Sequence, residues 1–376
     1  MQITRIGALG AIVLAGGLAL AGCASTPSTR PTGDTSPTAS SAASGLDAID
    51  PSLKGTLTAG GSSAQANAET AWAAAFNSVA SGLVINYDKS QGSGGGRTNF
   101  ISGAYDFAGS DAPLSADETT KAAATYPSGA VDLPIYLDGV SVAYNVAGVT
   151  KLNLTTETIA KIFAGQITDW SDAAITADNG GTALPAGKIT VVVRSDSSGT
   201  AQNFTNFLAA SAPDVWTWPG SGTFPADIAG TDAQKGGGAV HDEIAKVAGS
   251  IGYLDHSAVG DLASATVNGV APTADAVAAA YSAGATVKSN GVAGDLSIVF
   301  DYAKINADTA AYPIPLLSYA IIPLEFKDPA QAKLTVAYLQ FVASEDGQKA
   351  AAAKANSVPL PAEILAQVNA TLATVK

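Results

Sequence analysis

Short apolar runs alternate with segments of helical periodicity along the chain from about residue 53 onwards. Three runs in the first part of the body are predicted strands, at 55–59, 84–87 and 105–108. A helix with Trp72, Phe76 and Val79 on one face is predicted after the first strand, and a second helix is predicted to run through 99–101. Repeated strand–loop–helix units predict an α/β fold with a largely parallel sheet.

The same alternation continues towards the C-terminus. Further strands are predicted at 140–144, 189–193 and 249–253. A helix is predicted over 155–164 with Gly165 as its stop, and 178–187 has the composition of a surface loop. Asp328 followed by Pro329 is typical of a helix N-cap and first position, so another helix is expected there.

Polar, glycine-containing turns follow four of the predicted strands. They are Gly60–Ser63, Gly92–Gly96, Gly109–Pro113 and Arg194–Thr200. The last is the most informative, because a turn that leads into a helix presents free backbone N–H groups and the positive end of the helix dipole. Gly199 permits close approach of a ligand, Ser198 and Thr200 add hydroxyl groups, and Arg194 adds a cation with bidentate geometry. This combination suits a tetrahedral oxyanion.

Each candidate residue also has a simple structural explanation when it is considered alone. Ser63 is in a position to cap a helix, and Ser93 lies in a stretch that suits a flexible loop. Asp111 suits a turn, and Arg194 suits a surface salt bridge with Asp196. Taken together they favour a site, because each follows a predicted strand and ligands gather at the carboxyl ends of such strands.

Composition narrows the function further. The 376 residues are enough for two domains, and the formal charge of −13 argues against a nucleic-acid partner. It does not exclude an anion, because an anion site is built from local dipoles and not from net charge. Two histidines and one cysteine, with no paired ligand spacing, argue against a metal site. No nucleophile elbow, dinucleotide fingerprint or phosphate-cradling P-loop occurs, so we expect a binding protein without a cofactor and not an enzyme.

The N-terminus has the pattern of a secretion signal at residues 1–23. Arg5 precedes an apolar run that is too short for a membrane span and that ends at Leu20–Cys23. This ending resembles a bacterial lipobox, in which the cysteine is lipidated; an ordinary signal peptide with an incidental Cys23 is the alternative. Residues 24–50 are rich in Ser, Thr, Pro, Ala and Gly, so a disordered tether is expected between the membrane anchor and the body.

Six motifs, in family order, give the chain a more specific resemblance. They are Leu57–Ser63, Gly92–Gly96, Asp106–Leu114, Ile162–Trp170, Arg194–Thr200 and Gly249–Tyr253. With these motifs the chain resembles the phosphate-binding lipoproteins of bacterial high-affinity phosphate ABC importers. The resemblance implies a two-lobed, type II periplasmic-binding-protein fold with mixed sheets flanked by helices. It places 51–140 and 254–376 in lobe I, 141–253 in lobe II, and the ligand in the cleft between them.

The resemblance also implies a ligand set. It consists of Ser63, Ala64, Ser93, Asp111, Arg194, Ser198, Gly199 and Thr200, with Asp196 holding Arg194. Many family members have Thr-Phe where this chain has Ser63-Ala64, so a hydroxyl is kept and an aromatic ring is lost. Asp111 would accept a hydrogen bond from the anion's own proton, which favours phosphate over fully ionised sulfate because two facing unpaired negative charges are costly when buried.

The function implied is extracytoplasmic binding of inorganic phosphate and its delivery to the membrane permease of an ABC importer, from a body anchored to the cell membrane through Cys23. Three alternatives stay open from the sequence. The first is a binder of another oxyanion, such as sulfate, molybdate or tungstate. The second is a secreted phosphatase, against which the lack of metal ligands speaks. A sensor or adhesion lipoprotein with the same fold is a third reading.

Overall fold

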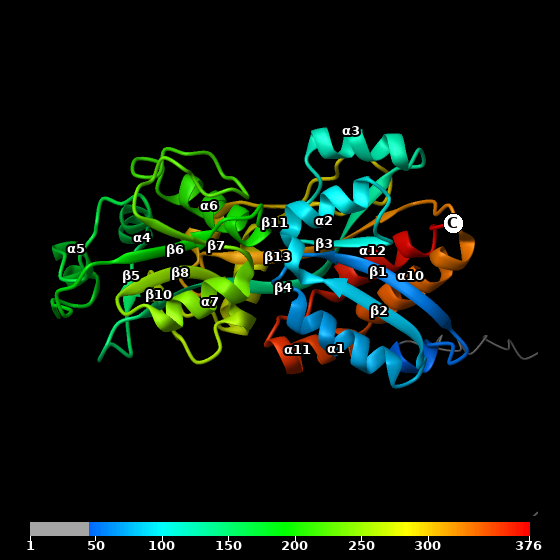
Figure 1. Cartoon of the computed structure of the whole chain (residues 1–376), viewed down its shortest axis with the longest axis horizontal. Coiled ribbons are helices and arrows are strands. Elements are labelled where there is room, and N and C mark those ends of the chain that lie inside the picture. Colours follow the sequence, from blue (N-terminus) through cyan, green and yellow to red (C-terminus); the bar gives the residue numbers. More distant parts are fainter. Residues whose placement is uncertain (1–44) are drawn as a thin grey trace, which may run out of the picture. The chain divides into compact units, whose positions relative to one another are not determined.

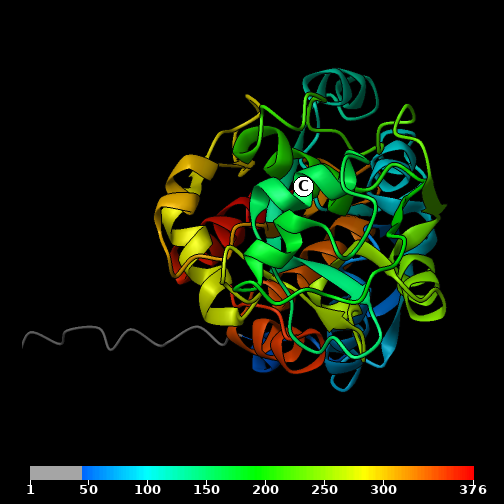
Figure 2. The same cartoon turned by 90° about the vertical axis from the view of Figure 1, so that its left-hand side faces the viewer.

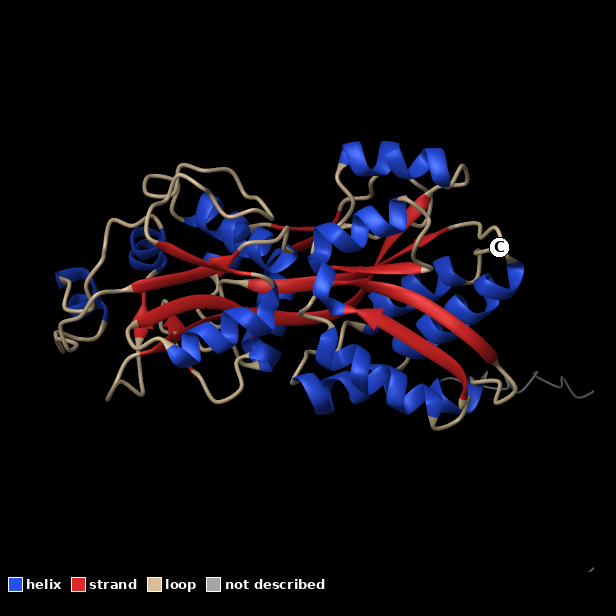
Figure 3. Ribbon diagram, in the orientation of Figure 1, coloured by secondary structure: helices blue, strands red, loops and turns tan. Residues whose placement is uncertain are grey.

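Nine strands of the described part of the chain, residues 45–376, form one mixed β-sheet in this computed structural model (Figures 1 and 3). Their order is β2-β1-β3-β13-β4-β8-β6-β7, with β9 paired to β4. The strands are β1 Lys54–Gly61, β2 Gly82–Asp88, β3 Phe107–Ser110, β4 Ala130–Asn145, β6 Thr190–Arg194, β7 Thr231–Gln234, β8 Ser250–Asp255, β9 Ala263–Ser264 and β13 Pro315–Pro323. Two small sheets pair β5 Asn153–Leu154 with β10 Thr266–Val267, and β11 Ala285–Val287 with β12 Ile298–Phe300.

Helices cover both faces of the large sheet, with α2 and α3 above it and α1 and α11 below it in the view of Figure 1. Seen from the left-hand end of that view, helices lie around the strands on several sides (Figure 2). The helices are α1 Ala66–Asn77, α2 Gly92–Ile101, α3 Ala116–Thr125, α4 Thr156–Phe163, α5 Ala173–Asp178, α6 Gly199–Ser211, α7 Gly236–Lys246, α8 Ala274–Gly284, α9 Tyr302–Ala307, α10 Pro329–Val342, α11 Glu345–Ala355 and α12 Ala362–Leu372. Short 3₁₀ helices are η1 Gly45–Ala48, η2 Lys89–Gln91 and η3 His256–Ala258.

The sheet is not largely parallel as the strand–helix alternation predicts. The pairs β1–β2, β1–β3, β6–β7 and β6–β8 are parallel, but β13 runs antiparallel to β3 and β4, and β4 runs antiparallel to β8. The parallel pairs lie where strands are joined through helices, as expected. The antiparallel centre forms because β13 returns from far along the chain, and a local pattern contains no information about such a pairing.

Strand β4 passes from one half of the sheet to the other. Residues 130–139 pair with β13, whereas residues 140–145 pair with β8. One continuous strand therefore belongs to two packing environments, as expected for a strand that joins two lobes. The predicted lobe boundary at 140/141 lies beside this change of partner, and the lobe limits themselves stay a prediction.

The predicted tether, 24–50, is wrong for its last residues. Residues 45–50 are part of the folded body, where η1 packs near α10 and α11. The backbone N–H of Leu46 donates a hydrogen bond to Asp346 Oδ2 at 3.0 Å, and Ile49 is buried. The polar composition of 24–50 as a whole predicts a tether, although Leu46 and Ile49 pack against the core. The rest of the tether and the predicted signal with Cys23 lie outside the described residues.

The predicted glycine loop 92–96 is also wrong, because these residues form the first turns of α2. Glycine disfavours helix, so a tertiary contact outweighs local propensity here. A Cβ on Gly96 would lie 2.6 Å from the Cα of Gly61, and a Cβ on Gly94 would lie 2.1 Å from Ser197 Oγ. The glycines therefore let α2 approach β1 and the turn before α6 closely, which agrees with the close backbone approach expected of them.

Other local predictions are confirmed. Helix α4 begins after Thr155, whose hydroxyl accepts a hydrogen bond from the backbone of the first turn, and the chain leaves it at Gly165 with a φ of +71°. Asp328 caps α10 by accepting from the Ala330 N–H at 2.9 Å. The surface loop follows α5, as expected from 178–187.

A buried carboxyl group on α1 is an unusual feature of the core. Glu69 is 3% exposed, and its Oε2 accepts a hydrogen bond from the Tyr338 hydroxyl at 2.8 Å. Its other oxygen has no hydrogen-bond partner among the described residues. Burial raises the pKa of Glu69 to about 8, although the Tyr338 hydrogen bond works in the opposite direction. The folded protein therefore holds a proton on this group over much of the neutral range.

We predict that the difference in the free energy of unfolding between Glu69→Gln and wild type depends on pH. From pH 5 to pH 8 this difference should shift in favour of the variant by about 2–4 kcal/mol. The pKa of Glu69 rises on folding from 4.5 to about 8. The contribution of Glu69 to the stability of wild type is therefore fully present below pH 4.5 and is lost as the pH rises from 4.5 to about 8. Urea denaturation at both pH values measures it. Exposed Glu363→Gln is the control, and an equal effect of both variants at the two pH values would contradict the assignment.

Candidate functional site

The predicted polar residues from four separate turns meet at the centre of the large sheet. Ser63 lies between β1 and α1, and Ser93 lies in the first turn of α2. Asp111 follows β3, Arg194 ends β6, and the Ser198–Thr200 segment begins α6. Since the parallel strands of each half end here, their carboxyl ends bring these side chains together, as expected for an α/β sheet.

Asp111 is the most heavily bonded carboxylate of this cluster, and it is only 3% exposed. Its Oδ1 accepts hydrogen bonds from the hydroxyls of Ser62 and Ser318, the latter at 2.6 Å. Its Oδ2 accepts from Thr200 Oγ1 at 3.2 Å and from Ser93 Oγ at 3.4 Å. These four hydroxyls compensate the carboxylate for the water that it loses on burial.

The contacts of Asp111 join the two halves of the sheet. Asp111 follows β3 in one half, whereas Thr200 and Asn203 belong to α6 in the other, and Asn203 Nδ2 donates to the Asp111 carbonyl oxygen at 2.7 Å. A Cβ on Gly199 would lie 2.6 Å from both Asp111 Cβ and Ser93 Oγ. Glycine at 199 is therefore required for this approach of α6.

Arg194 is held rigidly by Asp196. Its Nε donates to Asp196 Oδ1 at 2.8 Å, its Nη2 donates to Asp196 Oδ2 at 2.6 Å, and its Nη1 lies 3.3 Å from Ser63 Oγ. Burial would raise the pKa of Asp196, but the hydrogen bonds and charge of Arg194 outweigh it, so this pKa lies below its usual value. Side-chain exposures of 3% and 9% rule out the surface salt bridge that the sequence left open.

A cavity of about 30 Å³ lies between these groups. It is lined by Ser63, Ala64, Arg194, Thr200, Gly237, Gly238, Tyr253, Leu254, Asp255 and Ala258. Four predicted site residues thus reach the cavity directly. Asp111 and Ser93 do not line it and lie beside it, where Asp111 bonds to Thr200. Its small volume suits a single small ion.

Two of the predicted ligands have structural roles in this arrangement. The Ser198 hydroxyl accepts a hydrogen bond from the Ala201 N–H at 3.1 Å, so it caps α6. Gly199 gives the close approach to Asp111 described above. The side chain of Ser63 accepts from the Gly237 N–H at 3.2 Å and does not cap α1. Its hydroxyl thus links α7 to Arg194.

Sequence reasoning missed several residues of the site. Ser318 lies in β13, where all nine residues are buried, so a polar residue inside a buried apolar run was the available signal. Tyr253 ends the motif Gly249–Tyr253, which predicts a strand and contributes to the family resemblance but indicates no ligand. It lines the cavity, and its hydroxyl accepts from the backbone N–H of Arg194 at 3.1 Å. Gly237 and Gly238 lie in the first turn of α7, which follows β7 directly, and both line the cavity.

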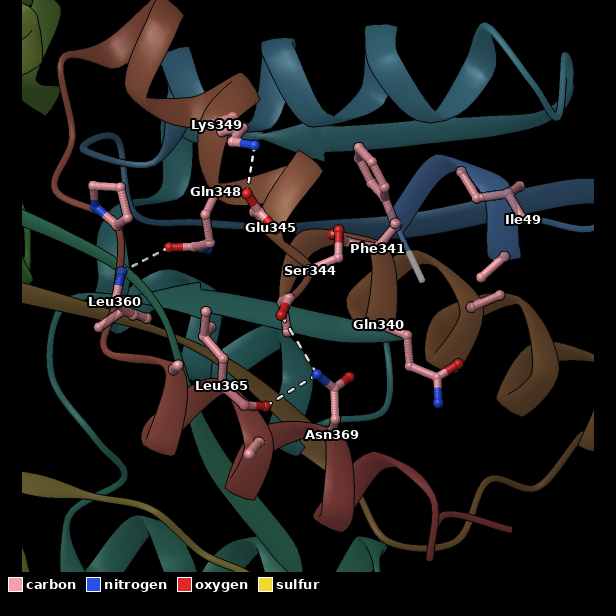
Figure 4. A pocket seen from close by; sticks show the side chains of 17 residues that line it. Ile49, Gln340, Phe341, Ser344, Glu345, Gln348, Lys349, Leu360, Leu365 and Asn369 are labelled. Carbon is pink, nitrogen blue, oxygen red and sulfur yellow. Dashed lines mark hydrogen bonds and ion pairs between the residues drawn. The ribbon is translucent and has the colours of Figure 1, made fainter. Parts of the chain in front are cut away.

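A much larger cavity, of about 850 Å³, lies between η1, α10, α11 and α12 (Figure 4). None of the predicted anion ligands lines it. Its polar groups are bonded to their own surroundings: Gln348 Oε1 accepts from the Leu360 N–H at 3.0 Å, and Asn369 Nδ2 donates to the Leu365 carbonyl at 3.0 Å. Size alone would select this cavity, but its chemistry does not suit an anion.

Residues 45–376 contain no group of three or more His, Cys, Asp or Glu side chains arranged to hold a metal ion. Over the same residues, the helices are all too short or too polar to cross a membrane.

Comparison with known proteins identifies relatives over most of the chain. Residues 34–346 match a family model described as a PBP superfamily domain. The phosphate-binding protein PstS 3 of Mycobacterium tuberculosis is 33% identical over 348 residues, covering 90% of this chain and 91% of the relative. PstS2 of Mycobacterium bovis is 34% identical over 391 residues, covering 98% and 100%, and PstS of Xylella fastidiosa is 35% identical over 311 residues, covering 80% of each.

Solved structures give the same fold. The phosphate-binding protein from Stenotrophomonas maltophilia superimposes with a TM-score of 0.67 at 22% identity, covering 84% of this chain and 93% of its own. An ancestral soluble variant of the human phosphate-binding protein gives a TM-score of 0.68 at 22% identity over the same shares. The two-lobed α/β fold with mixed strands that the resemblance implied is therefore confirmed.

Proposed function

The chain belongs to the PBP superfamily and to the family of PstS phosphate-binding proteins, and from this membership we propose that it binds inorganic phosphate outside the cytoplasm for delivery to an ABC permease. One observation supports phosphate most strongly. A buried carboxylate, Asp111, lies beside a cavity that also contains a charge-balanced Arg194. A protonated anion such as phosphate suits this cavity better than a fully ionised one, because its proton can be donated to the Asp111 carboxylate.

The proposed ligands are part of the set expected from the sequence, because the Ser198 hydroxyl caps α6 and the Ala64 N–H donates to Ser62 Oγ at 3.0 Å. Arg194 would pair with phosphate oxygens, because Asp196 fixes its guanidinium plane. Backbone N–H groups at the start of α6, with the Ser63 and Thr200 hydroxyls, would donate to the remaining oxygens. Ser93 and Thr200 donate to Asp111 Oδ2 in this structure, and turning either hydroxyl towards the anion would free that oxygen to accept the phosphate proton.

Binding would also favour the closed arrangement of the lobes. Asp111 and Arg194 lie in different halves of the sheet, so an anion held by both would bridge the halves. The closed body would dock on membrane permease subunits and release phosphate to them. Because its relatives are phosphate-binding proteins, we infer a transport protein and not an enzyme.

We also propose that the protein is attached to the outer face of the cell membrane as a lipoprotein. Cys23 ends the predicted signal segment, and the residues that follow it would act as a tether to the folded body, which begins at or before Gly45.

Titration calorimetry with phosphate and sulfate tests the binding function, and phosphate should bind with far higher affinity. We predict that Asp111→Asn lowers the phosphate-to-sulfate affinity ratio at least about tenfold, corresponding to about 1.4 kcal/mol, because the amide removes the negative charge that repels sulfate.

Asp295→Asn is the matched control, since Asp295 is also buried. Asp111 bonds to Thr200 in the cavity wall, whereas the groups that donate to Asp295 belong to residues that do not line the cavity. The affinity ratio of Asp295→Asn should equal that of wild type. Wild-type protein that preferred sulfate would refute the function, and an unchanged ratio in Asp111→Asn would refute the role of Asp111 alone.

Cys23→Ser should move the protein from the membrane fraction to the soluble extracytoplasmic fraction, because it removes the sulfur on which the lipid would be placed. Fractionation of cells expressing wild type and variant measures this. Cys23→Ser that stays in the membrane fraction would disprove the lipid anchor and leave the phosphate site untouched.

A further inference from the structure

Two buried carboxyl groups lie together where β4 changes partner. Asp138 of β4 is 2% exposed and Asp255 at the end of β8 is 4% exposed. The Tyr136 hydroxyl lies 2.9 Å from Asp138 Oδ2 and 3.2 Å from Asp255 Oδ2. The pair therefore lies between the two halves of the sheet, at the strands that cross between them.

The hydrogen bonds around this pair are unequal. Asp138 accepts from two backbone N–H groups, those of Gly139 at 2.8 Å and Ser257 at 3.2 Å. Asp255 accepts from the Ser257 hydroxyl at 2.5 Å, and no backbone N–H donates to its side chain. Tyr136 has one hydroxyl proton for two carboxyl oxygens, so both contacts are satisfied only when one of the two carboxyl groups itself holds a proton.

Asp255 also faces the proposed anion site. It lines the same cavity as Ser63 and Arg194. The charge of Arg194 is already balanced by Asp196, and Asp111 adds a negative charge nearby. An ionised Asp255 would therefore repel an incoming anion without a free cation to offset it.

The groups packed around the pair do not supply such a cation. In residues 45–376, no lysine or arginine side chain forms an ion pair with either carboxyl group. His256 follows Asp255, and its Nδ1 lies 2.8 Å from Ser141 Oγ. The other titratable neighbours are the hydroxyl groups of Tyr136, Tyr253 and Tyr312, the guanidinium of Arg194, and the carboxyl of Asp111.

The electrostatics agree with the hydrogen-bond pattern. Burial raises the pKa of Asp138 and of Asp255, and the neighbouring charge of Asp138 raises the pKa of Asp255 further. Asp111 acts on Asp255 in the same direction, whereas His256 acts on Asp138 in the opposite one. The proton thus belongs on the Asp255 side, and Asp138 is the ionised partner.

We propose that Asp138 and Asp255 share one proton and that this pair is part of the anion site. The pair would keep its proton when phosphate binds, and at a pH where the free protein has lost this proton, binding would take one up from solvent. The inference rests on the proposed phosphate function. Asp255 would act as a determinant of affinity, because its neutral form permits an anion in the cavity and its ionised form opposes one.

The test is phosphate affinity and proton uptake from about pH 6 to about pH 9.5, measured by calorimetry in buffers of different ionisation enthalpy. Each proton taken up on binding makes affinity fall about tenfold per pH unit. Wild-type affinity should fall more steeply than that of Asp255→Asn, with a difference approaching one proton per phosphate. The ionisation of phosphate itself affects both proteins equally and cancels in this difference.

Asp295→Asn is again the matched control, because Asp295 lies beside another buried aspartate, Asp132, away from the cavity. It should keep the wild-type slope. Asp138→Asn provides a second test should Asp255→Asn fail to fold. It removes the charge that favours the proton on Asp255, so the steep region should move to lower pH.

The outcomes separate the inference from the function on which it rests. Equal slopes in wild type and Asp255→Asn, or an unmoved profile in Asp138→Asn, would overturn the proton-sharing pair while phosphate binding stood. Wild-type protein that bound no phosphate at any pH would overturn the proposed function itself, and the inference with it.

Discussion

A buried carboxylate with no cation bonded to it constrains the whole site. Within residues 45–376, the partners of the Asp111 side chain and carbonyl are all hydroxyl and amide groups, and they come from β13, α6, α2 and the turn after β1. A carboxylate accepts hydrogen bonds and cannot donate them, so a ligand that reaches it must bring a donor. Thr200 of α6 helps to compensate the charge of Asp111, so α6 has to lie close to Asp111. This short distance requires glycine at 199. Attraction for an anion has to come from elsewhere, namely from Arg194 and the helix N-termini.

Local balance explains how a chain with a net charge of −13 provides an anion site. Arg194 is paired with Asp196, so it would offer the proposed anion directed N–H donors without an excess positive charge. Backbone N–H groups at the start of α6 and α7 add fixed partial charges that do not appear in the composition. In such a balanced site the protonation of one further carboxyl group, Asp255, changes the total charge appreciably. The proposed proton-sharing pair would therefore couple the anion site electrostatically to the place where β4 pairs with β8.

Local pattern was sufficient for much of this architecture. The β6 strand, its polar turn and α6 follow from the sequence around 189–208, as do the caps of α4 and α10. The antiparallel pairing of β13, and with it the contact of Ser318 with Asp111, depends on residues 207 positions apart and has no local signature. The glycine run in α2 predicts a loop, because the tertiary contact with β1 that makes it helical leaves no local signal. The composition around 45–50 predicts a tether, because its two large apolar residues stand in an otherwise polar window.

The most direct test of the central claim is a crystal structure of the protein with inorganic phosphate. The anion should lie between Arg194, Ser63 and Thr200, with one oxygen at hydrogen-bond distance from an Asp111 carboxylate oxygen and the two halves of the sheet closed around it. Phosphate bound elsewhere, for example in the large cavity beside η1, would contradict this, as would an Asp111 side chain turned away from the anion.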